Sequence, residues 1–298
     1  MPQTILQVIN FIKETLKTKY NEQGIKVIYL SLLKKFSNIE KSRVLAFKET
    51  VISDFTLSKI KDAVLRLKNS EPLDYITGEV EFCNVRIKVN NSVLIPRPET
   101  EELVGIVKSY AAQSKIKNIK ILEIGAGSGC ISVALKKMLP HSEIYATDIC
   151  SDALSLASYN ANKNKVNINF IKHDILNDNI DLLPAHIDIL VSNPPYVLES
   201  EKDVINDNVL KFEPYSSLFV NNNNPLLFYE KMIKLINLKF KNKDVFFAFE
   251  INPLLEEKLL QLCNTESIAD VRFVVDIFGK KRFLCGRKFH INERKKTN

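Results

Sequence analysis

The chain has 298 residues, of which 45% are hydrophobic and 26% charged, and its formal net charge is +7 at pH 7. This length accommodates one large domain and one small domain. The sequence shows neither a signal peptide nor an apolar run approaching the roughly 20 residues that a membrane helix needs. We therefore expect a soluble, cytoplasmic protein without a membrane partner.

The distribution of cysteine, histidine and lysine argues against a disulfide-linked, a metal-binding or a nucleic-acid-binding protein. The five cysteines form no C-x-x-C pair and the four histidines are dispersed, so we expect reduced thiols and no metal site. Basic residues are mixed with acidic ones, and the densest basic cluster is the tail from Arg287 to Lys296. The net charge would suit a nucleic acid, but only clustered charge indicates such a footprint. We favour a generally basic surface and expect no stable nucleic-acid partner.

The first seventy residues predict a small helical domain. Apolar residues recur at helical spacing over residues 5–16, 27–33 and 57–67. Thr4 and Ser53 supply helix-start signals for the first and last of these segments. No strand-like alternation interrupts the helices.

A change of character follows, because residues 85–89 alternate between apolar and charged side chains in a two-residue period. With Asn84 at a turn position, we predict a β-hairpin over residues 71–91, within a linker over residues 71–95. The next helix is predicted to begin near Pro98, since proline suits the first helical turn.

From residue 119 onward, strand-like segments alternate with helical ones, which is typical of an α/β fold with a mostly parallel sheet between helices. The last two strands are separated only by a short turn, so we predict that they are antiparallel. The predicted strands span residues 119–124, 143–147, 167–171, 187–191, 244–249, 271–276 and 282–285.

A glycine-rich loop follows the first of these strands. Glycines at alternate positions let the backbone bend tightly and approach a ligand closely at the carboxyl edge of the sheet. The third glycine comes one residue too early for a dinucleotide fingerprint, and Glu123 suits a cationic sulfonium better than a pyrophosphate. The loop resembles the first motif of S-adenosylmethionine-dependent methyltransferases, and the alternatives are NAD binding or a structural turn. The predicted cofactor-binding residues of this segment are Glu123, Gly125, Ala126, Gly127, Ser128 and Gly129.

Two acidic residues lie beyond the loop, each after a predicted strand. Asp148 can accept hydrogen bonds from both ribose hydroxyls of the cofactor. Asp174 is the candidate acceptor for the adenine amino group, and Ile175 can pack on the adenine ring. The alternative for Asp174 is that it only caps the following turn.

The tetrad Asn193-Pro194-Pro195-Tyr196 follows the fourth predicted strand. An amide nitrogen is a poor nucleophile because its lone pair is delocalised into the carbonyl group. The side-chain oxygen of Asn193 and the rigid carbonyl group of Pro194 can accept its two N–H bonds and turn the lone pair toward a methyl donor. Tyr196 can stack on the flat group. The alternative is a proline-rich turn, and tetrads of this kind also occur in methyltransferases of nucleic-acid bases.

These motifs together resemble the bacterial peptide chain release factor N5-glutamine methyltransferases, from residue 71 to about residue 285. One departure lies after the fifth strand, where Asn252 and Pro253 replace the glycine and glutamine that the family usually carries. Relatives that methylate a ribosomal-protein glutamine are less similar at Arg97-Pro98-Glu99-Thr100. The resemblance rests on Glu71 to Gly78, Leu94 to Glu101, the glycine loop, Asp148, the tetrad, Glu213-Pro214, Asp276, Gly279 and Arg282.

The resemblance implies a seven-stranded Rossmann-like methyltransferase sheet over residues 96–298, a helical substrate-recognition domain over residues 1–70 and the hairpin linker between them. It also implies methyl transfer from S-adenosylmethionine to the glutamine of the Gly-Gly-Gln motif in class I translation termination release factors. Asn193 would contact both cofactor and glutamine. The implied catalytic residues are Asn193, Pro194 and Tyr196, and the implied substrate-binding residues are these three together with Pro195. The alternative substrates are a ribosomal-protein glutamine and a nucleic-acid base. An intact loop and tetrad argue against a non-catalytic scaffold.

Overall fold

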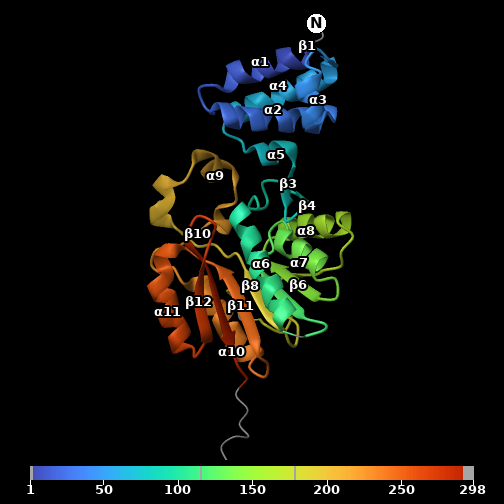
Figure 1. Cartoon of the computed structure of the whole chain (residues 1–298). Helices are drawn as coiled ribbons and strands as arrows, with labels where there is room; N and C mark the ends of the chain where they lie inside the picture. Colours follow the sequence, from blue (N-terminus) through green and yellow to red (C-terminus); the bar gives the residue numbers. More distant parts are fainter. Residues whose placement is uncertain (1–2, 115, 178, 291–298) are drawn as a thin grey trace, which may run out of the picture. The chain divides into compact units, whose positions relative to one another are not determined.

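The computed structural model describes residues 3–114, 116–177 and 179–290 (Figure 1). The chain divides into two compact units. A helical unit contains the residues up to Glu79 together with Asn206–Phe212, and a sheet unit contains Val80–Ile205 and the residues from Glu213 onward.

The helical unit is a bundle whose apolar faces meet in one core. Its first helix begins where the side chain of Thr4 accepts a hydrogen bond from the main-chain N–H of Gln7, and Gln7 returns one to Thr4. Ile12, Leu32 and Ile60 come from three helices and are fully buried in this core. The helices are α1 (Ile5–Leu16), α2 (Glu22–Ser37), α3 (Lys41–Ala46), α4 (Asp54–Lys68) and α5 (Leu73–Thr77).

The sequence-based description of this unit was wrong at two points. A two-residue strand pair, β1 (Gln3–Thr4) with β2 (Val51–Ile52), joins the start of the unit to the segment before α4. The predicted hairpin does not start at residue 71, because residues 73–77 form the helix α5 with Ile76 buried in the bundle core. The hairpin consists of β3 (Glu79–Phe82) and β4 (Val85–Lys88).

The sheet unit contains the predicted seven-stranded sheet. The five strands β7, β6, β5, β8 and β11 run parallel to their neighbours, and β13 pairs antiparallel with both β11 and β12, as predicted for the last two strands. The order across the sheet is β12-β13-β11-β8-β5-β6-β7. The strands are β5 (Lys120–Ile124), β6 (Glu143–Asp148), β7 (Asn169–Lys172), β8 (Ile189–Ser192), β11 (Val245–Glu250), β12 (Ala269–Val275) and β13 (Lys281–Lys288).

Helices cover both faces of this sheet because its central strands are apolar on both sides. On one face, Leu190 and Phe247 share a core cluster with residues of α10, among them Met232, and with residues of α11. On the other face, the ring of Phe246 stacks on Tyr110 at a centroid distance of 4.0 Å. The covering helices are α6 (Pro98–Gln113), α7 (Cys130–Met138), α8 (Ser151–Lys163), α10 (Leu227–Lys239) and α11 (Glu256–Thr265).

The strand order reverses between β5 and β8. The chain proceeds from β5 outward through β6 and β7, and then returns to β8 on the other side of β5. Ligands of open α/β sheets bind outside the carboxyl ends of strands at such a switch point. In the register of the two strands Ile124 pairs with Ser192, so the residues that follow each strand emerge side by side.

Short elements follow the tetrad along the chain. The two-residue strands β9 (Val197–Leu198) and β10 (Phe219–Val220) pair in parallel. Between β9 and β10 lie η1 (Glu199–Val204), α9 (Asp207–Phe212) and η2 (Tyr215–Ser217). A further short helix, η3 (Pro253–Leu255), follows β11. Within the described ranges, none of the helices combines the length and apolar character that a membrane crossing requires.

Candidate functional site

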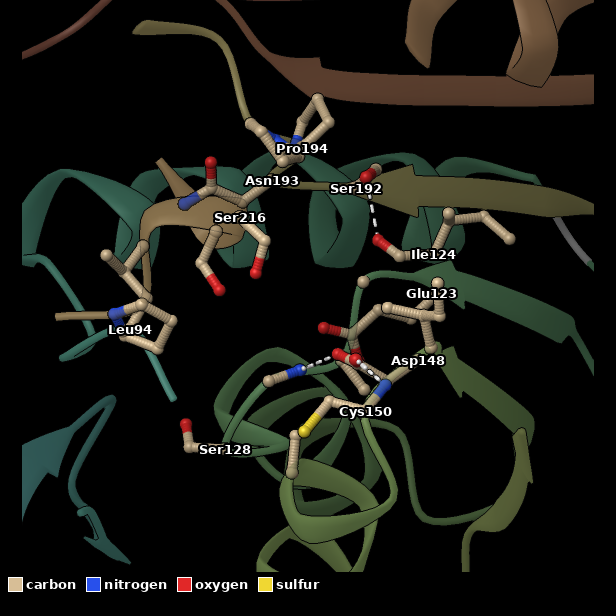
Figure 2. Close-up of a pocket in the computed structure, with 18 of the residues that line it drawn as sticks. Leu94, Glu123, Ile124, Ser128, Asp148, Cys150, Ser192, Asn193, Pro194 and Ser216 are labelled. Carbon is tan, nitrogen blue, oxygen red and sulfur yellow. Dashed lines mark hydrogen bonds between the residues drawn. The ribbon is translucent and has the colours of Figure 1, made fainter. Parts of the chain in front are cut away.

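A cavity of about 580 Å³ opens at the carboxyl edge of the sheet, between the ends of β5 and β8 (Figure 2). This volume lies within the range of roughly 300–1,000 Å³ that is usual for small-molecule sites. Two predicted site residues, Gly129 and Tyr196, are absent from the described residues that line the cavity. The predicted residues that line it are Glu123, Gly125, Ala126, Gly127, Ser128, Asp148, Asp174, Ile175, Asn193, Pro194 and Pro195.

The glycine loop needs glycine for two different reasons. Gly127 has a φ of 52°, in the left-handed region, and a Cβ atom there would meet nothing within 4 Å. Gly129 has a φ of 75°, and a Cβ atom there would lie 2.9 Å from the Cβ of Ala157 on α8. Gly127 therefore serves the backbone bend beside the cavity, whereas Gly129 permits close packing of the loop against a helix.

The carboxylate of Asp148 organises this loop. One oxygen accepts a hydrogen bond from the main-chain N–H of Gly127 at 2.8 Å, and the other accepts from the N–H of Cys150 at 2.9 Å (Figure 2). A carboxylate oxygen can accept more than one hydrogen bond. Asp148 can therefore hold the loop and still accept from a ligand in the cavity.

Glu123 is buried, with only 1% of its surface exposed. One carboxylate oxygen accepts hydrogen bonds from the N–H and the hydroxyl of Ser132 on α7, and the other has no hydrogen-bond partner among the described residues. Burial raises the pKa of this carboxyl to about 8, although the bonds from Ser132 oppose the shift. Glu123 is thus an incompletely satisfied acid in the cavity wall.

Asp174 performs the turn role that was the alternative in the sequence. Its Oδ1 accepts a hydrogen bond from the N–H of Leu176 at 2.9 Å, while the residue also lines the cavity. The remaining oxygen, Oδ2, is the atom to which an adenine amino group could donate. Ile175 lines the same wall.

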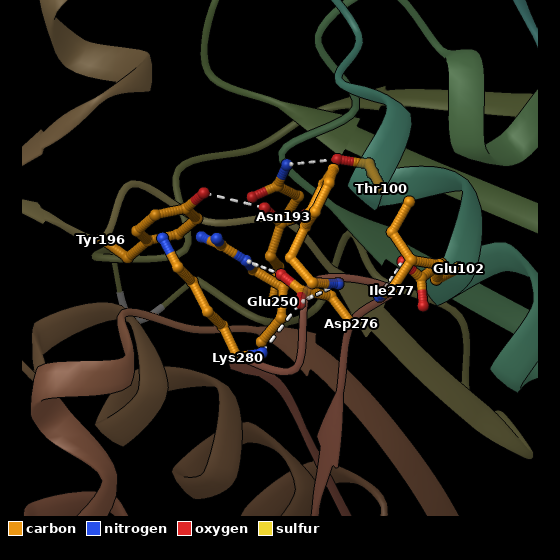
Figure 3. Close-up of polar contacts among 10 residues, drawn as sticks. Thr100, Glu102, Asn193, Tyr196, Glu250, Asp276, Ile277 and Lys280 are labelled. Carbon is orange, nitrogen blue, oxygen red and sulfur yellow. Dashed lines mark hydrogen bonds and ion pairs between the residues drawn. The ribbon is translucent and has the colours of Figure 1, made fainter.

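Two residues that sequence reasoning missed, Thr100 and Glu250, join the tetrad in one hydrogen-bonded network (Figure 3). The amide nitrogen of Asn193 donates to the hydroxyl of Thr100 at 3.2 Å, and that hydroxyl donates to Oε2 of Glu250 at 2.8 Å. The hydroxyl of Tyr196 donates to Oε1 of Glu250, also at 2.8 Å. Thr100 lies in the segment where a helix was predicted to begin, and Glu250 directly follows a predicted strand. Their hydrogen bonds and their burial, at 2% and 1% exposure, make them part of the site, and neither property can be read from the sequence.

The departure at Asn252 also has a structural role. Its amide nitrogen donates to the main-chain oxygen of Tyr196 at 3.2 Å and to the carboxylate of Glu201 at 2.6 Å. Its side-chain oxygen accepts from the N–H of Leu254 and caps the short helix η3. Asn252 therefore supports the end of the tetrad.

An ion pair between a partly exposed arginine and a buried glutamate lies beside the cavity. Glu213, which is 6% exposed, accepts hydrogen bonds from the guanidinium of Arg97 at 2.6 Å and from the N–H of Ile95 at 3.1 Å. Arg97 and Pro214, the residue after Glu213, both line the cavity. Two segments that carried the family resemblance are thus bonded to each other.

No group of three or more His, Cys, Asp or Glu side chains within the described ranges is placed to hold a metal ion. The polar side chains that line the cavity carry carboxylate, amide, hydroxyl, guanidinium and imidazole groups, which suit an organic ligand with hydroxyl and amino groups.

Two family descriptions match the chain. "PrmC N-terminal domain" matches residues 7–78, and "Methyltransferase small domain" matches residues 108–215. Among solved structures, the catalytic domain of human METTL16 with an RNA hairpin has a TM-score of 0.55 at 14% identity, covering 87% of this chain and 92% of that one. The N-terminal domain of human METTL16 in complex with SAH has a TM-score of 0.52 at 15% identity, covering 93% and 97%. At these identities the likeness shows the fold alone.

Curated relatives are more similar in sequence. The release factor glutamine methyltransferase of Flavobacterium psychrophilum is 37% identical over 272 residues, which cover 91% of this chain and 94% of that protein. The enzyme of the same name from Bacteroides thetaiotaomicron is 31% identical over 95% of this chain and 99% of that protein. The fold, the two matched domains and this near full-length identity agree, and the chain belongs to the release factor glutamine methyltransferase family.

Proposed function

We propose that this enzyme transfers a methyl group from S-adenosylmethionine to the side-chain amide nitrogen of the glutamine in the Gly-Gly-Gln motif of class I release factors. The observation that carries the proposal is the orientation of Asn193 in the cavity wall. Its amide nitrogen is bonded to Thr100, so its amide oxygen remains as an acceptor for a substrate N–H. The names of the curated relatives support the same substrate.

The residues around the cavity fit the proposed cofactor. Gly127 leaves open space where any other residue would place a Cβ atom. Glu123 keeps an unpaired oxygen, and a cationic ligand beside it would lower the raised pKa of this carboxyl and favour its ionised form. Asp148 would hold the ribose, while Asp174 and Ile175 would hold the adenine. When bound, S-adenosylmethionine supplies an electrophilic methyl group.

The tetrad would orient the acceptor and would not deprotonate it before transfer. Once the nitrogen carries the methyl group, one of its two protons would pass to solvent. The amide oxygen of Asn193 and the carbonyl oxygen of Pro194 would each accept one N–H of the glutamine amide. This arrangement would reduce the delocalisation of the nitrogen lone pair into the carbonyl group and direct the lone pair toward the methyl group. The hydroxyl of Tyr196 is bonded to Glu250, and its ring would stack on the flat amide group and fix the plane of that group.

The helical unit would recognise the protein substrate and leave the chemistry to the sheet unit. The cavity is lined only by residues of the sheet unit within the described ranges. The helical unit carries exposed Phe47, Val51 and Phe55, with exposed fractions of 61%, 60% and 71%. Large apolar side chains that gather in one exposed patch are typical of protein-binding surfaces.

The test compares the candidate substrates in parallel reactions. The purified enzyme is incubated with methyl-labelled cofactor and with a class I release factor, ribosomal protein or DNA in separate reactions. We expect label on the release factor at the Gly-Gly-Gln glutamine, located by mass spectrometry, and none on a release factor whose glutamine is replaced by asparagine. Label on the ribosomal protein or DNA instead would contradict the proposed substrate.

A further inference from the structure

Three side chains from distant parts of the chain form a one-directional hydrogen-bond relay to the tetrad (Figure 3). Thr100 stands in the first turn of α6, Asn193 follows β8, and Glu250 ends β11. The distances are 3.2 Å from Asn193 Nδ2 to Thr100 Oγ1 and 2.8 Å from Thr100 Oγ1 to Glu250 Oε2. Thr100 and Glu250 are both almost completely buried, and Thr100 also lines the cavity.

The charge state of Glu250 decides the direction of this relay. An ionised carboxylate only accepts hydrogen bonds, so the hydroxyls of Thr100 and Tyr196 must both donate to it. Once the single proton of the Thr100 hydroxyl is used, its oxygen offers only a lone pair to Asn193. The amide of Asn193 must therefore turn its nitrogen to Thr100 and its oxygen away.

Protonation of Glu250 would remove this constraint. A protonated carboxyl donates one hydrogen bond, and the Thr100 hydroxyl is then free to donate to the oxygen of Asn193. The amide would rotate and present its nitrogen where the acceptor oxygen is needed. An amide nitrogen cannot accept the N–H of a substrate.

Several groups around Glu250 act on its charge. Burial raises its pKa above the ordinary value and the nearby Glu99 of α6 acts in the same direction, whereas the hydrogen bonds from Tyr196 and Thr100 and the charge of Arg282 oppose the rise. Arg282 of β13 is itself paired with Asp276 at 3.2 Å. From α10, Tyr229 contacts Glu250 through its hydroxyl, which donates to the main-chain oxygen at 2.9 Å.

We propose that Thr100 and Glu250 are positioning residues, and that ionised Glu250 acts through Thr100 to hold the oxygen of Asn193 ready for the substrate amide. The proposal rests on the proposed function, since it explains how the methyl acceptor is oriented. Glu250 does not line the cavity, and Thr100, which does, would act through its bond to Asn193. Both act through Asn193, and Glu250 also holds Tyr196.

Two substitutions of Thr100 separate the effect of losing its hydrogen bonds from the effect of changing its packing. Thr100→Val keeps the shape and removes the hydroxyl, whereas Thr100→Ser keeps the hydroxyl and removes a methyl group. We expect Thr100→Val to lower kcat roughly tenfold or more while KM for the release factor changes little, and Thr100→Ser to retain most of the activity. Equal losses in the two variants, or an unchanged kcat in a folded Thr100→Val protein, would overturn the role of Thr100.

The pH profile tests Glu250. In the natural enzyme kcat should fall as the pH is lowered through the raised pKa of Glu250, because protonation releases the relay. Glu250→Gln, which always carries donor N–H groups, should have a low kcat without this acid limb, while cofactor affinity stays the same. An unchanged acid limb in Glu250→Gln would show that another group titrates and would refute the role of Glu250.

One measurement needs no methyl acceptor and therefore stands even if the substrate is not a release factor. Exchange of the side-chain amide protons of Asn193 with solvent can be followed by NMR in protein with isotope-labelled asparagine, the resonance being assigned by its loss in Asn193→Ala. We expect slow exchange in the natural protein and in Thr100→Ser, and faster exchange in Thr100→Val. Equal exchange rates in all three proteins would overturn the relay, whereas a failure of release-factor methylation with these rates as expected would contradict only the proposed function.

Discussion

The hydroxyl of Ser192 donates a hydrogen bond to the main-chain oxygen of Ile124 at 2.7 Å. These two residues end β8 and β5, and they are also direct partners in the register of the parallel strands. The pairing aligns the starts of the glycine loop and the tetrad at one point of the sheet edge. Residues of the glycine loop and of the tetrad thereby line one cavity.

Asn193→Ala should abolish most turnover while leaving cofactor affinity nearly unchanged. Alignment of the acceptor acts chiefly in the transition state, so kcat should fall by a factor on the order of 100 or more and KM should rise less. Turnover of a release factor is measured by mass spectrometry at saturating cofactor. Asn193→Asp keeps an acceptor oxygen and should retain partial activity, and near-normal turnover of Asn193→Ala would contradict the role of the tetrad.

Asp148→Ala should weaken cofactor binding at least tenfold. Each charge-assisted hydrogen bond to the ribose contributes about 1.5–3 kcal/mol, and the N–H groups of Gly127 and Cys150 also lose their acceptor. Calorimetric titration gives the affinity, and thermal unfolding confirms that the variant is folded. Asp188→Ala is a matched control, because Asp188 accepts from the N–H of Lys120 at the far end of β5. Equal affinities of Asp148→Ala and the natural protein would remove Asp148 from the site.

Glu123 should make the free protein less stable as the pH rises toward neutrality. Burial raises its pKa to about 8 in the folded protein, from an ordinary value of 4.5. Between these values the folded protein holds a proton that the unfolded chain has lost. The stabilising contribution is therefore complete below pH 4.5 and is lost progressively up to about pH 8.

Glu123→Gln keeps the oxygen that accepts from Ser132 and removes the titration. The free energy of unfolding of the natural protein should decrease relative to the variant by about 1.4 kcal/mol per pH unit at most. Denaturant unfolding of both proteins at several pH values within this interval measures the difference. Parallel pH dependences would mean that Glu123 is already ionised in the folded protein.

The double change Phe47→Ser and Phe55→Ser should raise KM for the release factor several-fold. Both side chains are more than half exposed in the helical unit, so their loss should cost little stability. Cofactor affinity and kcat should not change, because the cavity lies in the sheet unit. Leu65→Ser, at a position of the same unit that is 57% exposed, provides the control. A KM equal to that of the natural enzyme would contradict recognition through this part of the helical unit.

Local patterns in the sequence were sufficient for the architecture of the sheet and for its two main motifs. Period-two and period-3.6 repeats depend only on neighbouring residues, and they located the seven strands within a few positions. Glycine and proline restrict their own backbone, so the loop from Gly125 and the turn at Pro194 could be recognised without any knowledge of their partners. The same logic failed at α5, where burial of Ile76 against distant helices outweighed a weak local signal.

The tertiary structure alone decided which side chains meet and which are removed from water. Strand order places Asn193 beside a helix that begins more than ninety residues earlier, so the bond to Thr100 has no local signature. The sequence predicted Glu123 as a partner for a cation, and only the structure shows that it is buried, bonded to Ser132 of α7 and raised in pKa by that burial. Hydrogen bonding and desolvation depend on atoms brought together by the whole fold, which is why neither Thr100 nor Glu250 could be assigned from spacing.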